Sequence, residues 1–221
     1  MTELKLIVFD CDGTLVDGQY MILEAMRRAC HKLATEMPND NDVRRIVGLS
    51  LPEAIRRLFP LKDHALHMEI DHAFRSSYQD MRHEDSHEEP LFDGVHEVLQ
   101  DLNNQGYLLA VATGKSRKGL DNTLRLQGLE DMFVATRTAD DGPGKPHPQM
   151  IADIMNITGV NPAATAMVGD TSFDIQMARA AAVHAVGVSW GYHDFEDLQQ
   201  AGAHHILGHM RELPPLVETL L

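Results

Sequence analysis

The sequence is poor in cysteine and has no long apolar run. Only two cysteines occur among 221 residues, too few for a disulfide framework, and such low usage is typical of a reducing compartment. The first residues, Met-Thr-Glu-Leu-Lys, carry charges where a signal peptide has an apolar stretch. No uncharged apolar segment approaches the length of a membrane span. We therefore expect a cytoplasmic protein without a membrane partner.

Positive charge is also scarce. The chain has 19 lysines and arginines against 33 aspartates and glutamates, a formal net charge of −14. Proteins that bind nucleic-acid backbones need basic surfaces, so we expect no nucleic-acid partner. A site for an anion would depend on local attraction from a divalent metal, backbone N–H groups or a single cation. Lys145 is the only lysine or arginine between Arg137 and Arg179, which makes it a candidate for that cation.

Hydrophobic periodicity divides the chain into a core and an insert. Residues 4–9 form a short apolar segment, as in a buried strand. From about residue 17 to 88 the apolar residues recur at helical spacing, without a convincing strand pattern. Within this region Ser50-Leu51-Pro52-Glu53 has the form of a capped helix start, and a further helix fits 63–82. We expect an all-helical insert at 17–88.

The pattern after Pro90 alternates between strands and helices, which is typical of βαβ units and a mainly parallel sheet. The final stretch, 194–221, has two short helical segments around the apolar run Ala-His-His-Ile-Leu. The predicted fold class is therefore α/β, with a core made of 1–16 and 89–221. The expected elements of the second part are helices at 93–105, 116–127, 148–158 and 172–181, and strands at 107–112, 132–136, 164–168 and 183–188.

Two acidic motifs follow predicted strands. Asp10 and Asp12 come directly after the first strand, in Asp-Cys-Asp-Gly-Thr, and their side chains face the same way if the backbone is extended. Asp170 and Asp174 come after the fourth strand. Each pair has a structural alternative, because Asp-Gly is a common turn and aspartates are favoured at helix starts. A carboxylate directly after a buried strand nevertheless needs a partner or a metal.

Groups suited to an anion follow the other strands. Thr113-Gly114 ends the strand at 107–112, where a hydroxyl and free N–H groups at a helix start can hold a phosphate, although a plain turn is the alternative. Lys145 lies in a Gly-Lys-Pro loop, and a solvated loop lysine is its alternative. The carboxyl ends of parallel strands are where ligands bind in such sheets. These groups together predict a Mg²⁺ site facing a phosphate.

Two further motifs match known patterns and are set aside. The segment from His83 to His87 reads His-Glu-x-x-His, as in zinc proteases, but its Asp-Ser centre and the nearby Pro90 disfavour a regular helix. Gly114-Lys115-Ser116 matches the end of a nucleotide-binding loop, but Leu109 stands where that loop needs glycine. Neither motif is expected to take part in the chemistry.

Taken together, the four motifs resemble those of the haloacid dehalogenase superfamily of phosphohydrolases. The order is the same: DxDGT after the first strand, a threonine after the second, a lysine in the third motif, and GDxxxD after the fourth strand. The resemblance covers nearly the whole chain and implies a Rossmann-like core with a mobile helical cap at 17–88. One departure is Gly18, where many relatives have serine; this weakens a helix cap and leaves the chemistry intact.

The resemblance also implies an activity, the hydrolysis of a small phosphorylated metabolite with Mg²⁺ as cofactor. Asp10 would attack phosphorus and form an aspartyl-phosphate, while Asp12 would act first as an acid and then as a base. The implied metal ligands are carboxylates and one backbone carbonyl: Asp10, Asp12 (carbonyl), Asp170 and Asp174. The implied phosphate ligands are a hydroxyl, an N–H group and an ammonium: Thr113, Gly114 and Lys145.

The expected substrate comes from a closer resemblance, to phosphoglycolate phosphatases, which points to 2-phosphoglycolate. The four motifs contact only the phosphate, so selection of the leaving group must come from the insert. We expect the segment from Arg44 and Arg45 to Ser50 to close over Asp10, with Gly48 permitting the turn and an arginine pairing with a substrate carboxylate. The alternatives are a pyrophosphatase or broad sugar-phosphate phosphatase, a phosphomutase, and a phosphate-ligand sensor without turnover. A monomer and a homodimer are both open.

Overall fold

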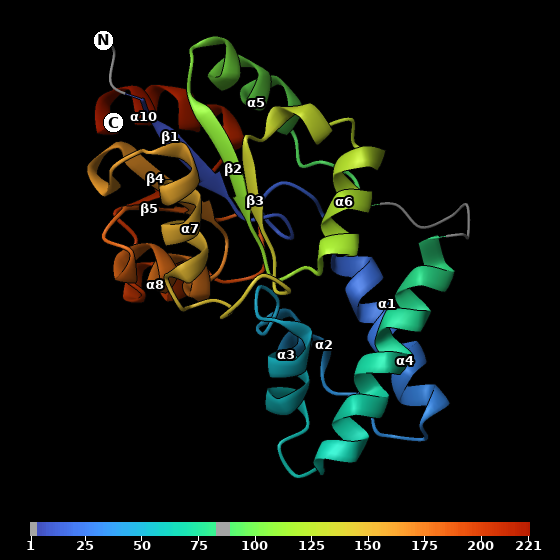
Figure 1. The fold of residues 1–221 in the computed structure, drawn as a ribbon. Coiled ribbons are helices and arrows are strands. Elements are labelled where there is room, and N and C mark those ends of the chain that lie inside the picture. Colours follow the sequence, from blue (N-terminus) through green and yellow to red (C-terminus); the bar gives the residue numbers. More distant parts are fainter. Residues whose placement is uncertain (1–3, 83–88) are drawn as a thin grey trace.

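A parallel sheet of six strands forms the centre of the molecule in the computed structural model, which describes residues 4–82 and 89–221 (Figure 1). The strand order is β3-β2-β1-β4-β5-β6, and each neighbouring pair is parallel. The predicted α/β fold is therefore confirmed. The strands are β1 (Leu6–Phe9), β2 (Leu108–Ala112), β3 (Ala135–Arg137), β4 (Thr165–Gly169), β5 (His184–Val188) and β6 (His205–Leu207).

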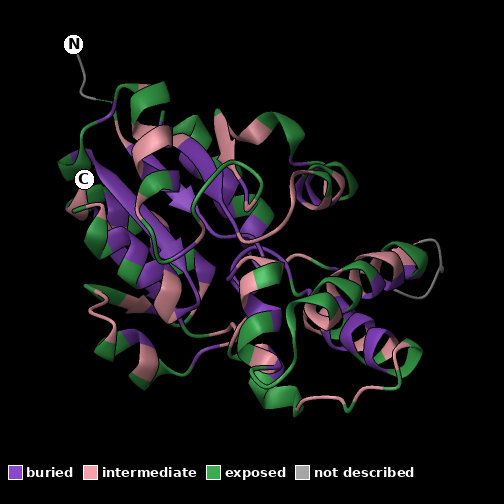
Figure 2. Ribbon diagram, turned by 60° about the horizontal axis from the view of Figure 1, so that its bottom comes forward, coloured by how far each residue is buried: buried purple, intermediate pink, exposed green. Residues whose placement is uncertain are grey.

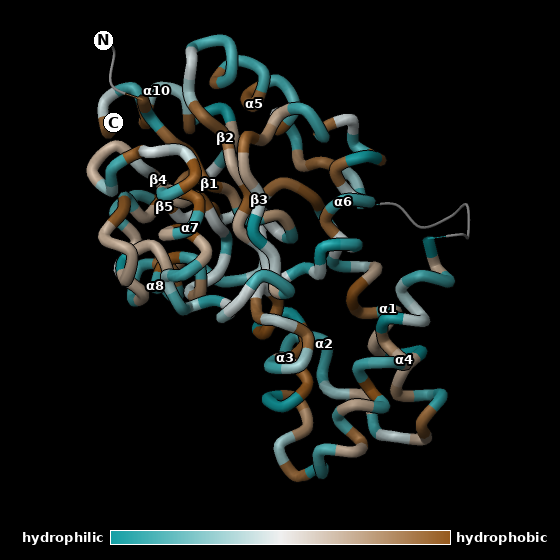
Figure 3. Tube along the Cα trace, viewed as in Figure 1, coloured by the Kyte–Doolittle hydropathy of each residue, from teal (hydrophilic) through white to brown (hydrophobic). Residues whose placement is uncertain are grey.

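The inner strands are buried on both faces (Figure 2). Successive strand residues point to opposite faces, so Ile7 and Phe9 of β1 join one apolar cluster, while Leu6 and Val8 join the other. The first cluster includes residues of α5 (Val95–Asn104), α6 (Arg117–Leu126) and α10 (Leu213–Leu220). The second includes residues of α7 (Gln149–Thr158), α8 (Ser172–Ala180) and α9 (Phe195–Gln200). The hydrophobic residues along β1 and β2 stand out in Figure 3.

The first four helices that follow β1 in the sequence form a separate group, which we call the cap (Figure 1). They are α1 (Gln19–Lys32), α2 (Asp40–Arg44), α3 (Leu51–Leu58) and α4 (His64–Arg82). Leu23, Ile55 and Ile70, from three of these helices, belong to an apolar cluster of the cap's own. The described part of the insert, up to Arg82, is thus all-helical as predicted. Its expected end at residue 88 lies outside the described residues.

Three short elements differ from the sequence-based prediction. Strand β6 pairs beside β5, where only an apolar stretch between helices was expected, because three residues are too few to show an alternating pattern. Helix α2 was not expected; it has five residues and begins after Asn39, whose side chain accepts a hydrogen bond from the N–H of Asn41 at 2.8 Å. Strand β3 starts at Ala135 rather than 132, because Glu130–Met132 forms a 3₁₀ turn. The remaining short turns are Pro162–Ala164 and Met210–Glu212.

None of the helices in the described residues is both long and apolar enough to cross a membrane.

Candidate active site

The predicted motifs meet at one edge of the sheet because their strands are neighbours. β1 lies between β2 and β4, so the residues that follow these strands come together at their carboxyl ends. Asp10 follows β1, Thr113 follows β2 and Asp170 follows β4. A hydrogen bond of 2.9 Å from the N–H of Asp10 to the carbonyl of Val168 continues the ladder to this point.

A buried lysine lies at the centre of this edge. Lys145 Nζ is 2.6 Å from Asp10 Oδ1 and 2.6 Å from Asp174 Oδ1, and all three side chains are almost fully buried. Asp170 completes the group, since one oxygen from each of the three aspartates lies within 4.8 Å of the others. The alternative of a solvated lysine is therefore excluded for Lys145 in this structure. Asp10 of the first acidic motif forms one cluster with Asp170 and Asp174 of the second.

The other aspartates of the cluster are held by hydrogen bonds. Asp170 accepts from Thr14 Oγ1 and from the N–H of Tyr192, each at 2.9 Å. Asp174 Oδ2 accepts from the N–H and hydroxyl of Thr171 at 3.0 and 2.7 Å. Thr171 is also the N-cap of α8 in a capping box with Asp174. The helix-start alternative thus holds for Asp174, and its Oδ1 is still left to face Lys145.

Close packing at this edge leaves no room for a side chain at several glycines, of which Gly13 and Gly114 are two. Gly13 has φ of +83°, and a Cβ there would lie 2.2 Å from Asp170 Oδ2. At Gly114 a Cβ would lie 2.5 Å from the carbonyl oxygen of Gly48 and 2.6 Å from that of Leu49. The first contact lets the DxDGT turn pass beside Asp170. The second shows that the loop of the cap around Gly48 lies directly over the end of β2.

The charges of the cluster do not balance. Three carboxylates face one ammonium, and burial raises the pKa of Asp10 to about 7 against the opposing effect of Lys145. Burial, followed by the charges of Asp10 and Asp174, also raises the pKa of Asp170. Burial alone would lower the pKa of Lys145, but its two carboxylate partners raise it above the ordinary value. The cluster can therefore accept more positive charge.

The donor set of the cluster fits a divalent metal. It offers oxygen atoms from Asp10, Asp170 and Asp174, and hard cations prefer oxygen ligands. Asp10 Oδ2 is buried and has no hydrogen-bond partner in the described part of the chain. A buried carboxylate oxygen without a partner is unfavourable unless a cation or donor reaches it. A cation bound among these oxygens would neutralise the excess negative charge.

A second buried lysine contacts the other motif aspartate. Lys115 Nζ is 2.8 Å from Asp12 Oδ1 and 2.9 Å from Glu89 Oε1, and Arg82 Nη2 is 2.7 Å from Glu89 Oε2. The hydroxyl of Tyr78 donates to Glu89 as well. Burial would raise the pKa of Glu89, but Lys115 and Arg82 lower it to about 2. Burial raises the pKa of Asp12, with Lys115 acting in the opposite direction.

Sequence reasoning missed this second group. The tripeptide around Lys115 was compared only with a nucleotide-binding loop, and no role was predicted for Glu89. Their contact spans 26 positions in the sequence. Asp12 two residues after Asp10 was the one available signal, since a second buried carboxylate also needs a cation nearby. The His83 to His87 motif lies outside the described residues.

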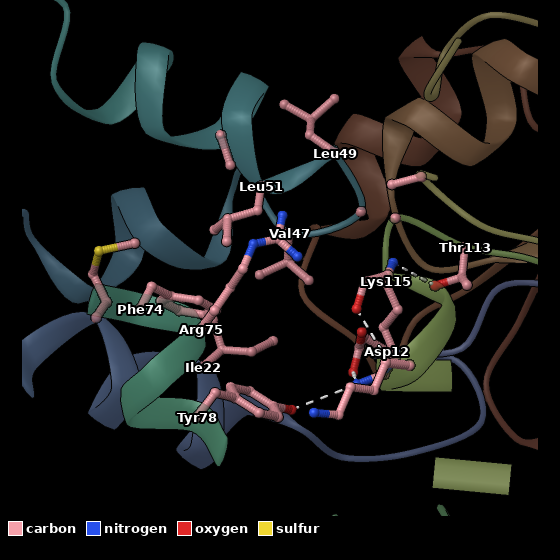
Figure 4. A pocket seen from close by; sticks show the side chains of 18 of the residues that line it. Asp12, Ile22, Val47, Leu49, Leu51, Phe74, Arg75, Tyr78, Thr113 and Lys115 are labelled. Atoms are coloured by element: carbon pink, nitrogen blue, oxygen red, sulfur yellow. Dashed lines mark hydrogen bonds and ion pairs between the residues drawn. The ribbon is translucent and has the colours of Figure 1, made fainter. Parts of the chain in front are cut away.

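Two of the groups expected to bind phosphate, Thr113 and Gly114, precede Lys115 directly in the sequence. Thr113 is buried, and its N–H donates to the carbonyl of Arg137 at 3.0 Å. The Thr113 hydroxyl accepts from the N–H of Lys115 at 3.2 Å. Thr113 and Gly114 both line a cavity of about 350 Å³ that Asp10 and Asp12 also line (Figure 4).

Of the four residues expected to select the substrate, only Gly48 lines the cavity. Gly48 lines it and has φ of +96°, as the expected turn requires. Arg44, Arg45 and Ser50 are not among its lining residues. Arg45 Nη2 instead lies 2.8 Å from Asp197 Oδ2 of α9. Ser50 is the N-cap of α3, as expected, but its side chain makes no capping hydrogen bond.

Comparison with known proteins agrees with this arrangement. Residues 7–188 match the haloacid dehalogenase-like hydrolase family. A probable phosphatase, IndB, from Dickeya dadantii (strain 3937) is 34% identical, over 98% of this chain and 94% of the other. Pyrophosphatase PpaX from Bacillus cereus (strain AH820) is 28% identical, over 99% and 98%. The crystal structure of a predicted phosphoglycolate phosphatase from Haemophilus somnus 129pt is 25% identical, with a TM-score of 0.85 over 98% and 99% of the two chains.

The family match covers most of the sequence and includes the first, second and fourth motif strands together with Lys145. The chain therefore belongs to the haloacid dehalogenase-like hydrolase family.

Proposed function

We propose that this hydrolase is a Mg²⁺-dependent phosphatase that cleaves small phosphate monoesters through an aspartyl-phosphate on Asp10. The observation that carries the proposal is the position of Asp10. Its Oδ1 is paired with Lys145, its Oδ2 has no hydrogen-bond partner among the described residues, and Asp10 lines the cavity. The names of the two curated relatives support a reaction at phosphorus.

In the first step Asp10 acts as the nucleophile. A carboxylate oxygen of Asp10 forms a bond to phosphorus while the bond from phosphorus to the leaving alcohol oxygen breaks. Asp12 donates a proton to that oxygen. Its raised pKa suits this role, because a general acid must hold a proton near neutral pH.

In the second step water releases the phosphate. Asp12, now a carboxylate, accepts a proton from the water as the water oxygen bonds to phosphorus and the bond to Asp10 breaks. Asp10 and Asp12 are then restored to their starting states. Lys145, the Thr113 hydroxyl and the Gly114 N–H hold the phosphate oxygens as negative charge builds on them.

The metal ligands we propose are Asp10, Asp170 and the backbone carbonyl of Asp12, with Asp174 completing the set. Mg²⁺ at this position would neutralise the repulsion between an anionic nucleophile and an anionic phosphate. The hydrogen bonds from Thr14 and Tyr192 fix the orientation of Asp170 for this role.

Similarity to proteins of known or predicted activity points to two small candidate substrates. The solved structure is of a predicted phosphoglycolate phosphatase, in line with the 2-phosphoglycolate expected from the sequence. The Bacillus relative is named a pyrophosphatase, which favours inorganic pyrophosphate as the second candidate. In both cases the transferred group is the same, and the proposed roles of Asp10, Asp12 and Lys145 are unchanged.

Phosphate release tests the proposal. The purified protein is incubated with 2-phosphoglycolate, pyrophosphate, sugar phosphates and phenyl phosphate, with Mg²⁺ and after treatment with EDTA. We expect release from at least one compound with Mg²⁺, little without it, and none from the Asp10→Asn variant. Equal release by wild type and Asp10→Asn would refute the proposed nucleophile, and no release from the whole panel would refute the phosphatase.

A further inference from the structure

The cavity continues beyond the catalytic aspartates into the cap. On that side it is bounded by apolar side chains from α1, α2, α3, α4 and the segment between α2 and α3. We call this surface the cap wall, and it consists of Ile22, Met26, Val43, Val47, Leu51 and Phe74. Figure 4 shows four of them, Ile22, Val47, Leu51 and Phe74, on the side of the cavity opposite Asp12 and Thr113.

The cap wall is the open side of the cap's own apolar cluster. Met26 and Val43 are buried members of that cluster, whereas Ile22, Leu51 and Phe74 pack against it and remain partly exposed. An apolar surface that faces a water-filled cavity gains free energy when a ligand covers it. Ligand cavities are commonly lined this way, with a few polar groups that fix the ligand's orientation.

One charged side chain lies among these apolar residues. Arg75 extends from α4 into the cavity, with its guanidinium beside Val47 (Figure 4). Asp71, which does not line the cavity, accepts from Arg75 Nε at 2.7 Å and from Nη2 at 3.2 Å. The hydrogen bonds of Arg75 within residues 4–82 and 89–221 use Nε and Nη2 and not Nη1. The hydrogen bond to Asp71 raises the pKa of Arg75, and Asp140, which also lines the cavity, adds to this effect through its charge. The pairing with Asp71 thus holds the guanidinium in place and leaves one donor group for a ligand.

We propose that the substrate is a phosphate monoester of a ring-bearing alcohol that carries a carboxylate or similar oxygen acceptor at its far end. The inference rests on the proposed phosphatase function. The ring packs on the cap wall, and the acceptor binds Arg75 Nη1 by a charge-assisted hydrogen bond. Arg75 and Phe74, adjacent on α4, are the residues that select the leaving group.

The two smaller candidates use the cavity less completely. In 2-phosphoglycolate the carboxylate is separated from the phosphate by a single carbon, so the molecule has no apolar part large enough to cover the cap wall. Pyrophosphate has no apolar part at all. Neither compound has an acceptor distant enough from the reacting phosphorus to account for a cation among apolar residues on the far side.

Binding of stable phosphonates tests the inference independently of turnover. Methylphosphonate, benzylphosphonate and 4-carboxybenzylphosphonate are titrated calorimetrically into the Mg²⁺-loaded protein. We expect the ring to tighten binding about tenfold over the methyl group and the carboxylate to add roughly another tenfold. Equal affinity for the three compounds, or tighter binding of methylphosphonate, would overturn the proposal.

Two variants assign the effects to residues. Phe74→Ala should remove most of the gain from the ring, with Phe74→Leu as a second variant should the alanine lower stability. Arg75→Met should remove the gain from the carboxylate and leave the affinity for benzylphosphonate within twofold. Arg27→Met is the matched control, because Arg27 also pairs with a carboxylate on its own cap helix, Glu24, but does not line the cavity. Equal losses in Arg75→Met and Arg27→Met would overturn the role of Arg75.

Failure of the phosphatase and failure of this inference give different results. If the phosphonates bind in the expected order but no phosphate is released from 4-carboxyphenyl phosphate or from any compound of the panel, the proposed reaction fails and the ligand class stands. If phosphate is released from 2-phosphoglycolate at least tenfold more efficiently than from 4-carboxyphenyl phosphate, the reaction stands and the ligand class fails.

Discussion

Two buried lysines, each held by two carboxylates, lie at the same edge of the sheet. Lys145 contacts Asp10 and Asp174 at 2.6 Å each, and Lys115 contacts Asp12 and Glu89 at 2.8 and 2.9 Å. Their geometries are nearly the same. Their surroundings differ, because Asp170 adds a third carboxylate to the first group, whereas Arg82 adds a second cation to the other.

The two groups therefore differ in net charge. We call the group around Lys145 the unbalanced group and the group around Lys115 the balanced group. With the carboxylates ionised, the first group carries three negative charges and one positive, a net of −2, and burial raises the pKa of Asp10 to about 7. The second carries two of each, a net of zero, and its cations lower the pKa of Glu89 to about 2. A group that keeps excess charge can bind a cation and a phosphate. The balanced group holds the Asp12 side chain through Lys115, and it joins α4 of the cap to α6 of the core through Glu89.

The largest effect is expected from Asp10→Asn. An amide cannot form the acyl-phosphate, so kcat should fall on the order of a thousandfold or more. Loss of one negative charge opposite the phosphate should leave substrate affinity unchanged or tighter. Steady-state kinetics with the best substrate of the panel gives both quantities, and retention of more than a tenth of wild-type kcat would contradict the assignment.

Lys145 should come next in effect. Lys145→Ala removes the only cation of the unbalanced group, and kcat/KM should fall by roughly a hundredfold to a thousandfold. Lys145→Arg should recover part of this, since a planar guanidinium cannot replace a compact ammonium between two carboxylates. A parallel measurement on Lys118→Ala, which removes an exposed lysine that lines the cavity, gives the control. Similar losses in the two alanine variants would show that burial of Lys145 is not the decisive property.

The unbalanced group should also control how stability and metal binding depend on pH. Because the folded-state pKa of Asp10 is raised to about 7, its contribution to the free energy of unfolding is fully present below its unfolded pKa. That contribution is lost as the pH rises through about 7. In the metal-free protein it should amount to a few kcal/mol at most, measured as the difference between wild type and Asp10→Asn in urea unfolding from pH 4 to 8.

The affinity for Mg²⁺ should change with pH in the opposite direction to the stability of the metal-free protein. Mg²⁺ needs the ionised carboxylate, so its binding below pH 7 should release a proton and its affinity should rise with pH. Calorimetric titration in buffers of different ionisation enthalpy measures the protons released. Affinity that stays constant from pH 5.5 to 8 would place the metal away from Asp10.

Breaking the balanced group should affect folding more than catalysis. Glu89→Gln leaves Lys115 and Arg82 without their shared carboxylate, and the free energy of unfolding should fall by about 3 kcal/mol. Because the folded-state pKa of Glu89 is lowered, the stability it provides is present above its unfolded pKa and is lost as the pH falls towards 2. The difference between wild type and variant should therefore shrink below pH 4.5 in urea titrations.

Two comparisons complete that test. Glu24→Gln removes a carboxylate from two exposed ion pairs on α1 and should change stability by less than about 1 kcal/mol. Turnover by Glu89→Gln should stay within tenfold of wild type, since the nucleophile and metal ligands are untouched. A fall in kcat of more than tenfold in a variant that remains folded would show that Glu89 takes part in the reaction.

The sequence predicts an element of the fold only where the apolar pattern is long enough and alternates regularly between strands and helices. The strands before Asp10, Thr113 and Asp170 are apolar and follow an alternating order with helices, so the sheet and the meeting of these residues could be predicted. Strand β6 has three residues and α2 has five, too few for a periodic pattern. These elements depend on tertiary contacts that form only once the larger elements have packed.

The two lysines show the same limit within the site. Lys145 was recognisable because the sequence around it is acidic and lacks any other cation from Arg137 to Arg179. Lys115 stands in a segment with Arg117 and Lys118, where a lysine looks like part of a solvated face. Its ammonium pairs with Glu89, the residue that directly follows the insert in the sequence. No local pattern encodes that contact.

The smallest effect is expected from Arg45, which the sequence favoured, with Arg44, as the residue that binds a substrate carboxylate. Arg45 pairs with Asp197 at 2.8 Å and its carbonyl accepts from His193 Nε2 at 3.0 Å, so it links the cap to α9 outside the cavity. Exposed pairs of this kind contribute about 0–1 kcal/mol. Arg45→Ala should therefore change KM for 2-phosphoglycolate and for phenyl phosphate by less than about threefold, and equally for both. Asp197→Ala breaks the same contact from the core side and should have the same small effect. If Arg45→Ala raises KM for 2-phosphoglycolate alone while Asp197→Ala does not, Arg45 leaves its partner to bind the carboxylate, and the selection of the leaving group moves from Arg75 to the segment that the sequence favoured.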